Sequence, residues 1–493
     1  MKPLLKKILA PATIAAIAAL SGCAVGPDFV RPPAPQQTGY TALPVASTIM
    51  AGGAAQSFVA GQDIPAQWWS LFHSPALNGL IEQALEHNPT LQAAQAALRV
   101  AQETVYAQQG AYYPTVSASF MPSRQKTATG SVSPTSASGA PLFNLHTAQV
   151  NVSYQLDVFG SNLRQVESLQ AQADAQRFEL EAARLTLSSN VVAAAVQEAS
   201  LRAQIAATVA SIDLMAQQLQ LLRQQLKAGV IAEAAVVAQE VILAQTRAVL
   251  PPLKKQLAQQ RDLLAALAGR YPGDAMSETF ELPMLDLPQL LPLTLPSKLV
   301  EQRPDVRAAE EQLHASSALI GVAKANMLPQ LTLSASAGGM AGEIGQLFKS
   351  GNGFWNLASG LTQPLFEGGT LLHRKRAAEA AYEQSAAQYR STVINAFQNV
   401  ADTLQALQFD AEALLLAQAA ERASASSVAI TRRQVELGDT GVVSLLLAEQ
   451  AYQQSGISLV QAQANRYADT AALFQALGGG WWNRSDEIAQ PLH

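Results

Sequence analysis

Cysteine is almost absent from this chain, since its 493 residues include only Cys23. A disulfide framework and a cysteine zinc site are therefore excluded. The six histidines are scattered, with no HExxH pattern and no other metal-ligand spacing, so we expect no metal site. A phosphate-binding GxxxxGK[ST] loop is also missing, which means that the chain cannot use ATP itself. We expect no cofactor, no catalytic residue and no enzymatic activity.

Charge and long apolar runs are also scarce. Charged residues make up 14% of the chain and hydrophobic residues 49%, and the formal net charge is −5. This acidic balance argues against a nucleic-acid partner. After residue 22 no stretch offers eighteen consecutive strongly apolar residues. We therefore expect no transmembrane helix in the mature chain.

The first 22 residues have the pattern of a lipoprotein signal peptide. A basic start at residues 2–7 precedes an apolar run from Ile8 to Leu20, and Ser21-Gly22 leads directly to Cys23. The run is too short to span a bilayer, and small residues before a cysteine are what lipoprotein signal peptidase requires. We expect Cys23 to become the N-terminus, with N-palmitoyl and S-diacylglycerol groups that bind membrane lipid. The following Ala24, in place of Asp, favours the outer membrane.

The chain contains an internal duplication. Short motifs recur at offsets of 207 to 215 residues, and a glutamate follows eleven residues after each of two matching glycines. The matching pairs are Asn88–Ala94 with Arg303–Ala309, Pro114–Ser117 with Pro329–Thr332, Val158-Phe159 with Leu365-Phe366, Gly229 with Gly438, and Glu240 with Glu449. Such self-similarity predicts two copies of one structural unit.

Each copy contains one very long helix. Residues 161–228 and 370–437 each run for 68 positions without proline and are rich in Ala, Gln, Leu, Glu and Arg. Helices of that size reach about 100 Å, enough to cross a compartment. A glycine turn follows each, at Gly229 and Gly438, and then a shorter helix of about 36 residues. Earlier helices, roughly 74–110 and 297–326, would supply the other half of the span by stacking end to end.

Four segments alternate apolar and polar residues as strands do. They are Thr115–Phe120, Val150–Val158, Leu331–Ala337 and Trp355–Leu365. An ordinary half-buried sheet alternates in the same way, but the lengths of the second and fourth segments, nine and eleven residues, and aromatic residues near the strand ends favour membrane-crossing strands. The last segment is the weakest, because its alternation fails at Ser359. Four strands cannot close a barrel and open edges are not tolerated in lipid, so two or three copies must associate.

Several motifs together resemble one known family. They are Cys23–Pro32, Asp63–Phe72 with its Trp68-Trp69 pair, Leu156–Gly160 and Pro364–Gly369. They resemble the outer membrane factor (TolC-like) family, in its NodT-like and OprM-like lipoprotein branch, over nearly the whole mature chain. The resemblance implies an α+β membrane protein. Its homotrimer would form a twelve-stranded barrel in the outer membrane, continuous with a long periplasmic helical barrel.

This resemblance also implies a division of the chain. Residues 1–22 are the signal peptide, 23–73 an N-terminal lipid-anchored segment, 74–296 the first repeat, 297–477 the second, and 478–493 a C-terminal tail. An equatorial belt around the helices would consist of residues 24–70, 271–296 and the tail from Gly478.

The family's function would be that of a passive exit duct. The resemblance implies a tripartite efflux system for drugs or other small solutes, in which an inner-membrane transporter supplies the energy. A periplasmic adaptor would contact the helical tips at Gly229 and Gly438, which also serve as helix caps. The alternative is the duct of a protein-secreting exporter.

The sequence departs from its family at the periplasmic entrance. In the best-known member, acidic residues stand six and nine positions after the second tip glycine; here Ser444 and Leu447 occupy those positions, and Ala235 stands six after the first. We therefore expect an apolar gate with a single carboxylate near the pore. The candidate gate residues are Asp439, Val442, Val443, Leu446 and Leu447. Packing of the apolar members between helices is the alternative.

Overall fold

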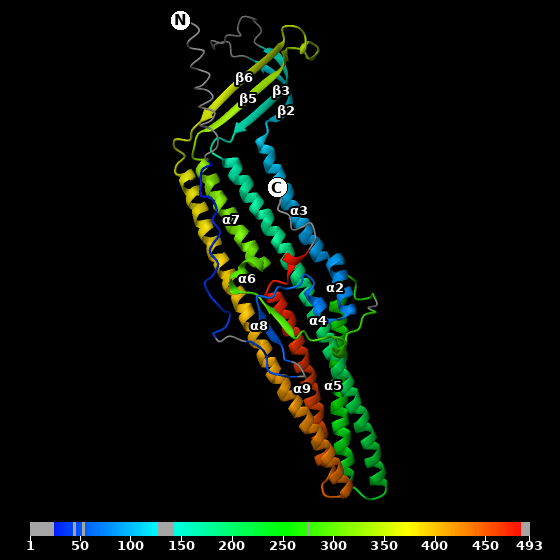
Figure 1. Cartoon of the computed structure of the whole chain (residues 1–493). Helices are drawn as coiled ribbons and strands as arrows, with labels where there is room; N and C mark the ends of the chain where they lie inside the picture. Colours follow the sequence, from blue (N-terminus) through cyan, green and yellow to red (C-terminus); the bar gives the residue numbers. More distant parts are fainter. Residues whose placement is uncertain (1–23, 43–45, 52–54, 127–141, 275–276, 485–493) are drawn as a thin grey trace. The chain divides into compact units, whose positions relative to one another are not determined.

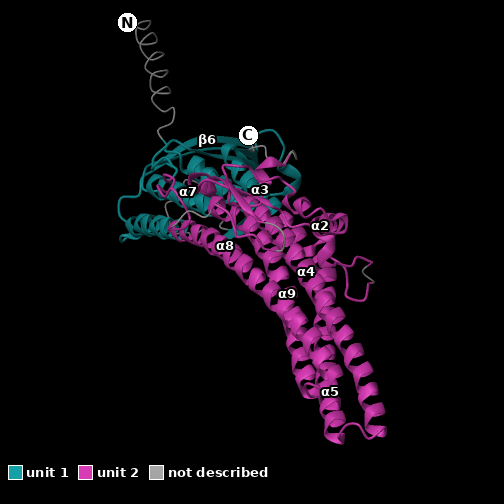
Figure 2. Ribbon diagram, turned by 60° about the horizontal axis from the view of Figure 1, so that its bottom comes forward, with its two compact units in different colours: residues 1–31, 98–176, 309–389 teal, residues 32–97, 177–308, 390–493 magenta. Residues whose placement is uncertain are grey.

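The computed structural model describes residues 24–42, 46–51, 55–126, 142–274 and 277–484. The signal peptide, Cys23 and the end of the C-terminal tail lie outside these residues. The chain divides into two compact units (Figure 2). Unit 1 consists of residues 1–31, 98–176 and 309–389, and unit 2 of residues 32–97, 177–308 and 390–493. Each unit therefore contains parts of both repeats.

Unit 1 contains an antiparallel sheet in the order β2-β3-β5-β6 (Figure 1). The strands are β2 (Thr115–Lys126), β3 (Leu142–Leu156), β5 (Gln330–Ala341) and β6 (Gly353–Thr362). The four predicted strands are confirmed, but their predicted boundaries are not: β2 and β5 extend beyond the predicted ends, β3 begins eight residues earlier, and β3 and β6 end before Val158 and Leu365. Pairing continues from Met121↔Thr147 to Lys126↔Leu142, because backbone hydrogen bonds do not need apolar side chains.

The strand β3 ends before Val158 because Asp157 begins the next helix. Its carboxylate accepts hydrogen bonds from the amides of Asn162 (2.9 Å) and Leu163 (2.8 Å). This side chain satisfies amides that have no partner within the helix. The strand β6 likewise ends at Thr362, two residues before Pro364.

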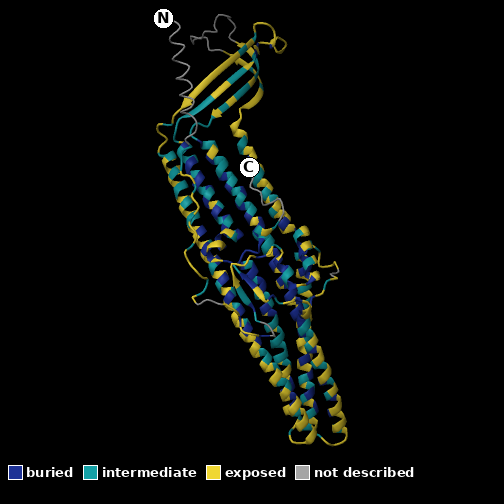
Figure 3. Ribbon diagram, viewed as in Figure 1, coloured by how far each residue is buried: buried dark blue, intermediate teal, exposed yellow. Residues whose placement is uncertain are grey.

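The register gives the sheet one apolar and one polar face. Directly paired residues share a face. One row across the sheet is Val116, Val152, Ala335 and Leu357, and the next is Ser117, Asn151, Ser336 and Asn356. Ser359 lies on the apolar face opposite Leu333, which explains the fault in the fourth predicted strand. Most residues of β2 and β6 are exposed in the single chain (Figure 3).

The long helices agree with the sequence. They are α4 (Ser161–Lys227) and α8 (Thr370–Leu437). Each leads into a helix of 35 residues, α5 (Glu233–Leu267) or α9 (Val442–Ala476). In unit 2 the α4–α5 and α8–α9 hairpins turn at the same end, with α5 beside α9 (Figure 1).

The half-length helices are each broken in two, so the prediction of continuous helices was wrong. The first is α2 (Pro75–His87) plus α3 (Pro89–Gln109), and the second is α6 (Pro296–Gln302) plus α7 (Pro304–Ala325). Prolines at the breaks lack the amide that would continue the helix. The side chain of Asn88 caps α3 by accepting from the amide of Thr90 at 2.9 Å. Both breaks fall in the duplicated Asn88-Pro89 and Arg303-Pro304 motifs.

A small parallel sheet in unit 2 was not predicted. Strand β1 (Ser57–Ala60) pairs with β4 (Leu290–Leu293), which brings together two of the proposed equatorial stretches. The third stretch joins them where Trp482 donates to Asp63 (2.9 Å) and Asn483 to the carbonyl of Ile64 (2.7 Å). Residues 24–31, however, belong to unit 1.

Among the described helices, α4 alone is long and apolar enough to cross a membrane by length and composition. The core helix of a soluble protein can share these properties. In unit 2 the central part of α4 is packed, with Val191, Val192 and Ala195 buried. It also holds the buried Glu198, which pairs with Arg202 at 2.6 Å.

Candidate functional site: hairpin tips and anchor peptide

The two hairpin tips are built in the same way. Gly229 and Gly438 have φ angles of +73° and +79°, a conformation that favours glycine. The amide of Val230 donates to the carbonyl of Gln225 (3.0 Å), and Asp439 donates to Gln434 (2.9 Å). This pattern is a glycine cap that satisfies the last carbonyls of α4 and α8. The predicted capping role of both glycines is confirmed.

Each hairpin also has an ion pair that joins its two helices. Arg223 pairs with Glu240 at 2.6 Å and Arg432 with Glu449 at 3.3 Å. Each glutamate stands eleven residues after its tip glycine, and each arginine stands six residues before the same glycine. Burial raises the pKa of Glu449, and Arg432 opposes this effect. Arg223 and Arg432 are also a duplicated pair in the sequence, but the comparison of motifs did not identify them.

The candidate gate residues divide into packed and exposed sets. Leu446 is buried, and Val442 packs against a cluster in the first hairpin that contains Met215 and Leu222. These two residues therefore have the packing role that the alternative interpretation gave them. Val443 and Leu447 lie one turn apart on α9, with 56% and 61% of their surfaces exposed. Asp439 is exposed at the tip itself.

In unit 1, the residues that follow Cys23 are docked on the protein. The amide of Val25 donates to the carbonyl of Phe159 at 3.1 Å. Gly26 lies so close to α7 that an added Cβ atom would come within 2.5 Å of the Cα atom of Gly321. Glycine is therefore required at both positions for this approach. We call residues 24–31 the anchor peptide.

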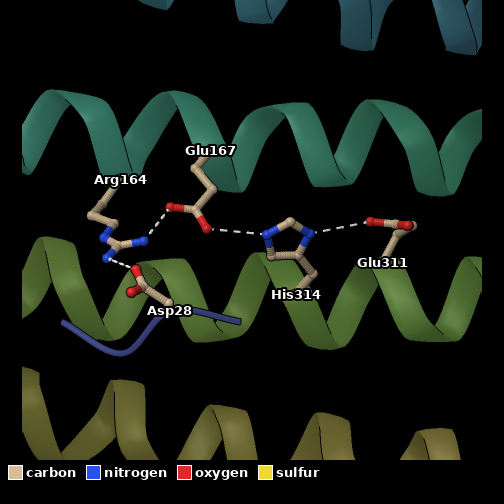
Figure 4. A network of polar contacts seen from close by, with 5 residues as sticks. All are labelled: Asp28, Arg164, Glu167, Glu311 and His314. Carbon is tan, nitrogen blue, oxygen red and sulfur yellow. Dashed lines mark hydrogen bonds and ion pairs between the residues drawn. The ribbon is translucent and has the colours of Figure 1, made fainter. Parts of the chain in front are cut away.

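A chain of ionic contacts connects the anchor peptide to α4 and α7 (Figure 4). Asp28 lies 2.6 Å from the guanidinium of Arg164, which also pairs with Glu167 at 2.7 Å. Glu167 contacts a ring nitrogen of His314 at 3.1 Å, and the other ring nitrogen lies 3.3 Å from Glu311. Because α4 belongs to the first repeat and α7 to the second, the network links the two repeats of the chain.

Two further contacts complete the docking. The ring of Phe29 stacks on that of His314, with centroids 4.4 Å apart, and Arg31 pairs with the buried Glu310 at 2.9 Å. The anchor peptide therefore has a fixed path. Cys23 lies outside the described residues, so its acylation stays a prediction.

The comparison with known families decides the identity of the chain. The model of the family "Outer membrane efflux protein" matches residues 80–270 and 295–479, one segment in each repeat. The chain belongs to the outer membrane efflux protein family. The predicted family is thus confirmed, and the chain is a channel component of the outer membrane, not an enzyme.

Relatives of this efflux protein match it over nearly their whole length. It is 30% identical to the toluene efflux pump outer membrane protein TtgF of Pseudomonas putida, covering 97% of this chain and 98% of TtgF. It is 29% identical to the pyoverdine export outer membrane protein OpmQ of Pseudomonas putida, covering 85% and 89%. The solved outer-membrane channel OprN superposes with a TM-score of 0.83 at 27% identity, covering 93% of this chain and all of OprN.

Docking of the anchor peptide in this efflux protein should depend on pH. A hydrogen bond with Glu311, and a further one with Glu167, raise the pKa of His314 above its ordinary 6.5, although burial opposes them. Because the folded pKa is the higher one, the stabilisation is complete below about pH 6.5. It is lost as the pH rises through the folded pKa. Hydrogen exchange of the Val25 amide should therefore be several-fold better protected at pH 6 than at pH 9, after correction for intrinsic rates.

Two variants check this dependence. His314→Gln should remove the difference between the two pH values, whereas His87→Gln, at an exposed histidine in unit 2, should leave it intact. Equal protection of Val25 at both pH values in the unaltered protein would show that the imidazolium does not support docking.

Proposed function

We propose that this efflux protein is the exit duct of a tripartite system that expels drugs or other small solutes. The duct is passive, a periplasmic adaptor binds the hairpin tips, and an inner-membrane transporter supplies the energy. The match to the efflux family in both repeats carries this proposal. The names of TtgF and OpmQ, which concern toluene and pyoverdine, support a small-molecule cargo over a secreted protein.

A strain that lacks the gene tests the cargo. It should become more sensitive to small toxic compounds, and the epitope-tagged channel should recover an adaptor and a transporter after cross-linking in intact cells. Unchanged sensitivity and no cross-linked partner would refute the efflux role. Loss of a secreted protein with unchanged compound sensitivity would favour a protein exporter instead.

We further propose that the working form is a homotrimer whose twelve strands close a barrel. The four-stranded sheet of the described chain has β2 and β6 as open edges, and unpaired backbone groups are not tolerated in lipid. Its apolar face suits contact with acyl chains, and its polar face suits an aqueous lumen.

An exposed stripe on α8 supports association of copies. Phe409, Leu416, Ile430 and Leu437 are spaced by multiples of seven residues, and each is 60% to 64% exposed. A strict seven-residue repeat favours a left-handed supercoil with another helix. On α4, Leu221 is also exposed. Like Ile430, it stands eight residues before a tip glycine. Leu221 of one chain and Ile430 of its neighbour would therefore lie at the same distance from the tips and could come into contact.

Disulfide cross-linking tests this interface. Cys23 is the only native cysteine and would be acylated, so Leu221→Cys with Ile430→Cys should give dimers and trimers on non-reducing gels. The control pairs Leu221→Cys with Phe409→Cys, which lies about 30 Å farther along α8 and should give none. Monomers from both pairs would contradict the interface, and a ladder beyond three copies would contradict the trimer.

The tips and the gate are part of the same proposal. Gly229 and Gly438 place two hairpin ends side by side for the adaptor. Asp439, Val443 and Leu447 would narrow the entrance, while Val442 and Leu446 would support them from the helix interface.

A further inference from the structure

The long helix of the second repeat begins with a cluster of basic residues. His373, Arg374, Lys375 and Arg376 lie within its first seven positions. Lys375 pairs with Glu379 at 3.1 Å. Arg374 and Arg376 are exposed, and neither has an ionic partner within the described part of the chain. The first turn of α8 contains no acidic residue, although acidic residues are the ones that the helix dipole favours there.

The equivalent place in the first repeat is neutralised from within the chain. There Asp157 caps α4, and the single arginine, Arg164, is held between Asp28 and Glu167. By the alignment of Val158-Phe159 with Leu365-Phe366, the residue that corresponds to Asp157 is Pro364. The second repeat therefore has more positive charge, and its nearby carboxylates, Glu367 and Glu379, form no ion pair with Arg374 or Arg376 in the described part of the chain.

Exposed apolar side chains stand between this cluster and the sheet. Strand β6 ends at Thr362, and Leu365 and Phe366 are 92% and 89% exposed. Apolar residues next to exposed basic residues are typical of protein segments that lie in a membrane surface. Because the whole chain is acidic, the basic patch is local and not a general property of the surface.

We propose that this patch binds anionic phospholipids in the periplasmic leaflet of the outer membrane. Leu365 and Phe366 contact the acyl chains, and Arg374 and Arg376 bind headgroup phosphates. The proposal rests on the strands crossing that membrane, which places the end of β6 at its periplasmic surface. The patch would fix the depth of the sheet from the second repeat, as the anchor peptide with an acylated Cys23 would from the first.

Lipid binding to the purified full-length channel tests the patch. The protein in non-ionic detergent is titrated with phosphatidylglycerol or phosphatidylcholine, and native mass spectrometry counts both bound lipids and protein copies. The unaltered channel should prefer phosphatidylglycerol. The double variant Arg374→Gln, Arg376→Gln should lose affinity for it by about fivefold per arginine, which corresponds to about 1 kcal/mol for each basic residue near an anionic surface.

The matched control is Arg124→Gln with Lys126→Gln. It removes the same charge from exposed residues of β2 in the same unit and should keep the preference. Equal binding of the two lipids to the unaltered channel, or equal losses in both double variants, would overturn the proposal. Loss of protein copies with phosphatidylglycerol affinity unchanged would show that the arginines contact a neighbouring copy instead. A failure of the strands to cross the membrane would be recognised separately, because a chain made without the acyl groups of Cys23 would then need no detergent.

Discussion

Replacing Leu447 with serine should open the periplasmic entrance of the channel. Leu447 and Val443 form the exposed apolar face of α9 beside the tip, and a ring of such residues in a trimer would exclude water and ions. A hydroxyl group admits water. We expect single-channel conductance in planar bilayers to rise on the order of tenfold, which corresponds to about 1.4 kcal/mol of barrier height.

The control is Leu263→Ser, an exposed leucine of α5 that lies far from the tip in sequence and should leave conductance unchanged. Asp439→Ala should weaken the preference for cations, because it removes the carboxylate nearest the entrance. If Leu447→Ser and Asp439→Ala both behave like the unaltered channel, the gate lies elsewhere.

Replacing Arg466 with methionine should release the N-terminal segment of unit 2. Arg466 is 1% exposed and donates to Gln56 (3.0 Å) and to the carbonyl of Ala51 (2.7 Å). Each hydrogen bond that a buried charged group loses costs about 1.5–3 kcal/mol, so the loss of both costs about 3–6 kcal/mol. The amides of Ser57 and Phe58, which hold β1 in place, should therefore exchange with solvent about a hundredfold faster or more.

The same change should perturb a nearby acid. Burial and the neighbouring Asp469 raise the pKa of Asp410 to about 7, and Arg466 lowers it, so this pKa should rise further in Arg466→Met. The control Arg433→Met removes an exposed arginine that pairs with Glu436 at 3.0 Å. Similar exchange rates for Ser57 in both variants would show that Arg466 does not hold the segment.

Periodic features of the fold could be predicted from the sequence, and isolated contacts could not. The proline-free runs predicted α4 and α8 almost to the residue, and alternation predicted all four strands of unit 1. The breaks at Pro89 and Pro304 were missed, although both prolines stood in the aligned motifs. Both prolines indicated the repeat, but each also lacks the backbone amide that would continue a helix, and this second consequence predicts the breaks.

The functional residues show the same limit. Motif spacing located the tip glycines, whose caps depend on local backbone geometry. It could not separate Leu446 from Leu447, because the burial of Leu446 depends on tertiary packing, which spacing along the chain does not reveal. The network of Asp28, Arg164 and His314 joins residues far apart in the chain, so no local pattern indicated it. Nor did any local pattern indicate that the anchor peptide is packed against α4 and α7.

Membrane attachment without the acyl groups tests the central claim most directly. Residues 1–23 are replaced by a signal sequence that ordinary signal peptidase removes, so the exported chain begins at Ala24 and has no lipid. If the strands of several copies cross the outer membrane, this protein should stay in the outer-membrane pellet after an alkaline carbonate wash and should require detergent for extraction. Its recovery in the soluble periplasmic fraction would contradict the account.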